Sequence, residues 1–125
     1  MVLLEMLVGA ALSTTQPSAE AARKPVSLRL VGDDGLSLRF ADALQAELAH
    51  DPYLRPSSTS EPAALTIESD HNIRWDKLNG RKVAIYTVYV GSKRDDPITG
   101  VCWENELFKC ARDVLRIVRI EAEDH

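Results

Sequence analysis

The clearest alternation of apolar and polar positions along the chain lies between Leu65 and Asp76. Every even-numbered position of this segment is polar, whereas four of the odd-numbered positions carry large apolar side chains. A period of two is typical of a β-strand that buries one of its faces. The large apolar positions are Leu65, Ile67, Ile73 and Trp75. The segment therefore predicts a strand whose odd-numbered side chains point into a core.

The dipeptide Asn79-Gly80 separates this strand from a second one over 81–90, which is rich in β-branched and aromatic residues. Asn-Gly accepts the positive φ angles of a two-residue type I′ turn, so we expect a long β-hairpin. In such a turn Leu78 lies opposite Arg81, and the rest of the register follows. On the apolar face this register pairs Trp75 with Ala84, Ile73 with Tyr86 and His71 with Val88.

The segments around this hairpin predict the remaining elements. Alternation over 26–30 predicts a first strand, and apolar residues at four-residue spacing over 36–48 predict a helix capped by Asp34. A short strand over 98–103 precedes a helical pattern that starts at Glu104. The order β-α-β-β-β-α is typical of an α+β fold, with an antiparallel or mixed sheet and two helices packed on one face.

The first twelve residues form an apolar run, followed by small and polar residues. This pattern, with Ala19-Glu20-Ala21 as a cleavage site, predicts a signal peptide over 1–21 and a single domain over 25–122. Glu5 and the absence of an early basic residue depart from the pattern, and a frayed amphipathic helix is the alternative. The run is shorter than the ~20 apolar residues of a membrane span, so no span is expected. The predicted location is periplasmic or secreted.

Composition limits the kind of partner. The net charge of −4 does not favour a nucleic acid, because binding a phosphate backbone needs clustered Lys and Arg. The same charge is too small to indicate a strongly basic partner.

The two cysteines, Cys102 and Cys110, are eight positions apart and do not form a CxxC motif. Cys102 is expected at the end of a strand, and Cys110 on the core side of the following helix. A disulfide can form if that helix folds back over the sheet, and an exported protein favours it. Two buried free thiols are the alternative.

No grouping of residues predicts catalysis, a cofactor or a metal site. His71 is expected to be a core residue of the hairpin, His50 lies at the end of a helix and His125 lies in the C-terminal tail. This spacing is not a metal-ligand pattern. Paired carboxylates, such as Asp33 with Asp34, are explained by turns and helix capping.

Two groups of residues are candidates for a partner surface. Val83, Ile85 and Tyr89 put apolar side chains on the second face of the hairpin. The last helix carries a basic stripe. Its members are Arg112, Arg116 and Arg119. Scattered surface hydrophobes and a solvated, ion-paired helix face are the alternatives.

The helix GLSLRFADALQAEL, the Pro/Ser-rich loop over 51–62 and the strand AALTIES follow an apolar leader. Over residues 25–90 this layout resembles small bacterial envelope domains, of the type of the TolB N-terminal domain and the lipoprotein LptE. The resemblance implies an accessory, non-catalytic role in the cell envelope. No cysteine follows the leader to accept a lipid, which departs from the lipoprotein type.

Three hypotheses follow from these observations. The first is a periplasmic or secreted accessory domain that binds a protein or an envelope component. The second is a cytosolic regulatory module that forms a homodimer through the exposed face of the hairpin. The third is a small enzyme that uses His71 beside a carboxylate, which requires an open cleft.

Overall fold

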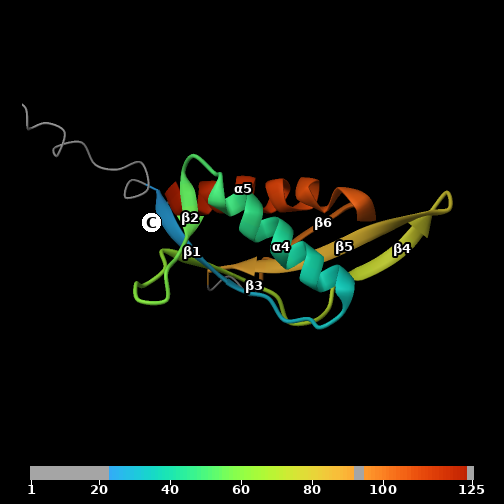
Figure 1. Ribbon diagram of the computed structural model, residues 1–125, viewed down its shortest axis with the longest axis horizontal. Helices are drawn as coiled ribbons and strands as arrows, with labels where there is room; N and C mark the ends of the chain where they lie inside the picture. The colour runs from blue at the N-terminus through green and yellow to red at the C-terminus, as the bar shows by residue number, and fades with distance from the viewer. Residues whose placement is uncertain (1–22, 92–94, 124–125) are drawn as a thin grey trace, which may run out of the picture.

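A computed structural model of the chain describes residues 23–91 and 95–123. These residues form a mixed six-stranded sheet with two α-helices, which confirms the predicted α+β class (Figure 1). The elements are β1 (Lys24–Arg29), α4 (Gly35–Ala49), β2 (Leu54–Pro56), β3 (Leu65–Glu68), β4 (Arg74–Leu78), β5 (Arg81–Val90), β6 (Ile98–Trp103), the 3-10 turn η1 (Glu104–Glu106) and α5 (Leu107–Glu123).

Strand β1 pairs in parallel with β2 and β3, whereas β5 pairs antiparallel with β3, β4 and β6. The sheet is therefore mixed, which is one of the two arrangements that the order of the elements left open. Both helices lie on one side of it, as Figure 1 shows, and we call the other side the open face. The core fills the space between the sheet and the helices. Its largest fully buried side chains include Leu44, Leu48, Ile67, Val88, Val114 and Leu115.

Helix α4 begins where the sequence predicts. The Ser37 N–H donates a 2.7 Å hydrogen bond to Asp34 Oδ1, so the carboxylate caps the helix. The helix buries residues four apart, among them Phe40, Leu44 and Leu48, which is the stripe that the spacing indicated.

The hairpin turn is confirmed at Asn79 and Gly80, whose φ angles are 53° and 79°. Positive φ at both central positions is the requirement of a type I′ turn, and Asn-Gly meets it at little cost. Leu78 pairs with Arg81, and Trp75 pairs with Ala84, in the predicted register.

The prediction of one continuous strand from Leu65 to Asp76 is wrong in its middle. Residues 69–73 lie between β3 and β4 and belong to neither strand, so His71 does not pair with Val88. The break has a physical cause in contacts from the segment before α4 and from the first turn of α4. The Val31 N–H donates to Ser69 Oγ at 3.0 Å, and the Ile73 N–H donates to Ser37 Oγ at 2.9 Å. His71 is consequently exposed rather than buried.

Trp75 is also not a core residue, because 52% of its surface is exposed. It is on the helix side of the sheet, where its partner Ala84 is buried, but the helices do not extend over the end of the hairpin (Figure 1). We call residues 74–82, which project beyond the helices, the hairpin arm.

Strand β2 falls inside the segment predicted as a loop over 51–62. Asp51 positions it, because its Oδ1 accepts hydrogen bonds from the N–H groups of Tyr53 at 2.8 Å and Leu54 at 2.9 Å. Its second oxygen pairs with Arg119 of α5 at 2.6 Å, and only 2% of the Asp51 side chain is exposed. A buried carboxylate needs such partners, so Asp51 ties α4, β2 and α5 together.

The described residues contain no helix with the length and apolar character needed to cross a membrane. The predicted leader over 1–21 lies outside the described residues.

Candidate functional site

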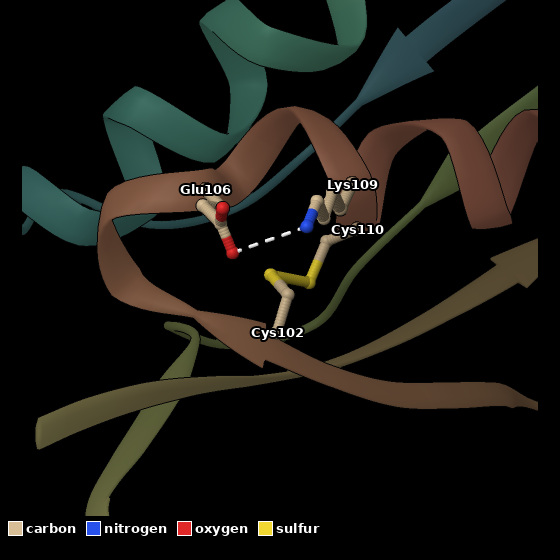
Figure 2. Close-up of a disulfide and its surroundings, with 4 residues drawn as sticks. All are labelled: Cys102, Glu106, Lys109 and Cys110. Carbon is tan, nitrogen blue, oxygen red and sulfur yellow. Dashed lines mark ion pairs between the residues drawn. A yellow bond between two sulfur atoms is a disulfide. The ribbon is translucent and has the colours of Figure 1, made fainter.

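The predicted disulfide is present between Cys102 and Cys110, whose Cα atoms are 5.7 Å apart. Figure 2 shows the bond joining β6 to the first turns of α5. Cys110 is fully buried and Cys102 is half-buried. The nearby ion pair of Glu106 and Lys109, at 3.3 Å, lies on the same turn of the chain. The bond thus has a structural role, since it fastens a helix to an edge strand.

The surroundings of His71 do not support the enzyme hypothesis. The side chain lines a cavity of about 20 Å³, which has room for little more than one water molecule. No Asp or Glu lines this cavity. His50 ends α4 with Nδ1 3.0 Å from the Ala46 carbonyl oxygen, and His125 lies outside the described residues. Within residues 23–91 and 95–123 no group of three or more His, Cys, Asp or Glu could hold a metal ion.

Shifted pKa values have local structural causes. Burial raises the pKa of the Tyr86 hydroxyl. The Ser37 N–H lowers the pKa of the capping Asp34, and hydrogen bonds from Arg55 lower the pKa of Glu61 to about 2. A cap, an ion pair and a buried phenol explain these shifts, and the three groups do not form a catalytic cluster.

The basic stripe of α5 is engaged in ion pairs. Arg112 pairs with Glu47 at 3.0 Å and Arg119 pairs with Asp51 at 2.6 Å, so both join α5 to the preceding helical region. Arg116 pairs with Asp113 of its own helix at 3.2 Å. A role of these arginines in binding a partner stays a prediction.

On the open face, Val83, Ile85 and Tyr89 of β5 are half-buried. The adjacent strand β6 adds Val101, which pairs with Ile85 and is 62% exposed, and Trp103, which pairs with Val83. Sequence reasoning missed these two residues. The sequence does place Thr99, Val101 and Trp103 on one face of a strand by their alternation. That this face is the open face of the sheet follows only when the pairing of β6 with β5 is known.

The hairpin arm carries two large, exposed apolar side chains. Trp75 and Leu78 are 52% and 54% exposed and lie on opposite faces of β4. Lys82 Nζ lies 4.5 Å from the centre of the Trp75 ring. On the open face, Arg81 Cζ lies 3.8 Å from the centre of the Trp103 ring. Each indole is therefore held beneath a cation by a cation–π contact.

A groove of about 320 Å³ separates the arm from the start of α4, with Trp75 and Lys82 on one wall and Leu36 on the other. Arg39 and Glu104 also line it and form an ion pair. The two carboxylates that line the groove already have structural partners, since Asp34 caps α4 and Glu104 pairs with Arg39.

No family model, curated protein or solved structure matches this chain. The resemblance to envelope domains of the TolB and LptE type therefore stays a prediction, and the functional argument depends on the fold and its surfaces.

Proposed function

We propose that this protein is a periplasmic or secreted accessory domain that binds another protein through the hairpin arm. The observation that carries the proposal is the exposure of Trp75 and Leu78 on an arm that projects beyond the helices (Figure 1). An exposed tryptophan flanked by basic residues has the character of the side chains that anchor protein interfaces.

The arm has the composition of a protein contact site. Trp and Arg are the residues that most often dominate binding energy at protein interfaces. The cation–π contacts of Trp75 with Lys82 and of Trp103 with Arg81 hold the side chains in place before binding. Ordering them in advance reduces the entropy that association costs.

The charge of the arm indicates the chemistry of the partner. Residues 74–82 contain four basic residues and one acidic residue, so their net charge is 4 − 1 = +3, whereas the whole chain carries −4. The basic residues are Arg74, Lys77, Arg81 and Lys82. We expect a partner surface with an apolar pocket for an indole, surrounded by carboxylates.

The disulfide and the predicted leader support the location. Disulfides persist in oxidising compartments such as the periplasm and are rare in the cytosol, where thiols are kept reduced. A bond between Cys102 and Cys110 is compatible with an extracytoplasmic site of action.

Site-specific photo-crosslinking in the native host tests the proposal. A photoreactive amino acid replaces Leu78 on the arm or, as a matched control, Ile120 on α5, which is 57% exposed. We expect a protein adduct from position 78 and none from position 120. Trp75→Ala should reduce the adduct by at least about tenfold, because loss of a hot-spot tryptophan costs about 2 kcal/mol or more.

Equal adducts from positions 78 and 120, or none from 78, would contradict the assignment of the arm. Circular dichroism of each variant checks that the fold is intact.

A further inference from the structure

The outer edge of β6 carries backbone groups that no described residue pairs. Strand β6 pairs only with β5, in one continuous register from Ile98 to Trp103. In an antiparallel ladder, successive residues direct their N–H and C=O groups alternately to one neighbour and to the other. The two-residue turn makes Leu78 and Arg81 a hydrogen-bonded pair, so odd-numbered residues of β5 bond to β4 and even-numbered ones to β6.

The matching positions of β6 follow from its register. Ala84 pairs with Cys102 and Tyr86 pairs with Gly100, so the even-numbered residues of β6 bond to β5. Thr99, Val101 and Trp103 then direct their N–H groups outward, and Thr99 and Val101 also direct their C=O groups outward. Trp103 is the N-cap of η1, so its C=O already accepts a bond of that turn. Within residues 23–91 and 95–123 these three N–H groups have no hydrogen-bond partner.

The two other strands with an unpaired edge are protected. Strand β2 is three residues long and ends in Pro56, which has no N–H. Strand β4 is charged, and the N–H groups of Lys77 within it and of Ile73 just before it are already used. Ile73 donates to Ser37 Oγ at 2.9 Å, and Lys77 donates to Asp76 Oδ1 at 2.7 Å.

Strand β6 has none of these devices. Its six residues, ITGVCW, include no charge and no proline, and its register with β5 has no bulge. An uncharged edge of this length is a template for pairing with another strand.

We propose that the occupant is β6 of a second copy of this chain, paired antiparallel around a two-fold axis at Val101. A continuous sheet requires paired residues to share a face, so the axis must pass beside a residue and not between two residues. An axis at Val101 pairs residues 99–103 of β6 with the same residues of the second copy. It sets Val101 against Val101, and Thr99 against Trp103 of the second copy.

This register also gives every outward N–H group of the strand an acceptor, with the Trp103 C=O accepting a second bond. In it Val101 forms a hydrogen-bonded pair with its symmetry mate, and the two Thr99–Trp103 pairs do the same. The exposed side chain of Val101 becomes covered at the axis, next to Ile85 of the same face. The net charge of −4 per chain gives only weak repulsion between the copies.

Two-fold pairing occupies both β6 edges, so it closes at a dimer and does not continue into a fibre. The hairpin arm lies at the end of β5 that adjoins Trp103, and the two arms consequently project from opposite ends of the dimer. They stay available to a partner, so the dimer goes beyond the proposed function and does not depend on it.

Introducing a charge at position 101 tests this register in solution. Size-exclusion chromatography with light scattering of the purified protein should give twice the mass that denaturing mass spectrometry gives. Val101→Glu and Val101→Lys each place like charges against each other, so each variant alone should have the mass of a monomer. An equal mixture of the two should regain the dimer mass, because position 101 opposes position 101. Leu78→Glu, a matched change on the same face of the arm, should leave the dimer intact.

Circular dichroism confirms that the variants fold, as expected for a side chain that is 62% exposed. If the variants do not fold, hydrogen exchange of the unaltered protein tests the register instead. The amides of Thr99, Val101 and Trp103 should then exchange more slowly as the concentration rises.

A protein that stays monomeric up to its solubility limit overturns the proposal, as does a dimer that survives Val101→Glu. Protection of the three amides in a monomer would mean that the chain covers its own edge. Crosslinking of position 101 to a different protein, with the purified chain monomeric, would assign the edge to a heterologous strand. Both results would also contradict the proposal that a second copy occupies the edge. Crosslinking from position 78 tests the proposed binding role of the hairpin arm independently of either result.

Discussion

Reduction of the Cys102–Cys110 bond should destabilise the protein by an amount that follows from the length of the loop it closes. The two residues are separated by eight positions. Cross-linking a loop of this size removes about 8 cal/mol/K of entropy from the unfolded chain, or about 2.5 kcal/mol at 25 °C. Reduction leaves every side chain in place except for the added hydrogens. The comparison of oxidised and reduced protein therefore isolates the cross-link from the loss of packing that a substitution would add.

The assay is urea denaturation followed by circular dichroism, with and without reductant. The free energy of unfolding of the reduced protein should be lower by about 2.5 kcal/mol, and its thermal midpoint by about 10–20 °C for a domain of this size. The double variant Cys102→Ala and Cys110→Ala serves as the control. It should unfold at the same urea concentration whether or not reductant is present.

A difference below about 1 kcal/mol between the oxidised and reduced protein would refute this reasoning, because it would mean that the unfolded chain gains little freedom on reduction. A response of the double variant to reductant would show that reductant acts elsewhere in the protein.

Two further changes test contacts of the fold. Gly100→Ala should lower the free energy of unfolding by about 1–3 kcal/mol in chemical denaturation, because an added Cβ would lie 2.5 Å from the buried Tyr86 hydroxyl oxygen; unchanged stability would contradict that close contact. Glu61 has a pKa of about 2 instead of 4.5, since Arg55 stabilises its carboxylate. A lowered folded-state pKa contributes stability above pH 4.5 that is lost as the pH falls toward 2. Glu61→Gln should therefore flatten the dependence of the thermal midpoint on pH over this window, and parallel curves would contradict the assignment.

The features that the sequence predicted depend on local information. Asn79-Gly80 determines the turn, and the turn determines the register of the adjacent residues, so the pairing of Trp75 with Ala84 was predictable. The disulfide was predictable because helical periodicity placed Cys110 on the core side of α5 and Cys102 ended the strand before it.

The features that the sequence did not predict depend on contacts between distant segments. Alternation assigns Trp75 to a face of the sheet, but it does not report how far the helices extend over that face. The break at His71 arises from Ser37, which is far away in the sequence. Strand β2 was missed because Asp51 positions it with help from Arg119, 68 residues later.

The leader, the arginine stripe and the resemblance to envelope domains stay predictions. The open-face residues were predicted in part, since β5 shows its own alternation but the contribution of Val101 requires the pairing with β6.

Intact mass spectrometry of the protein isolated from its native host tests most directly the claim that it acts outside the cytoplasm with its disulfide closed. Alkylation without reductant should leave the mass unchanged, and alkylation after reduction should add two alkyl groups, one at Cys102 and one at Cys110. The account also predicts a chain that begins after Ala21. A full-length chain whose two cysteines are alkylated without reductant would contradict it.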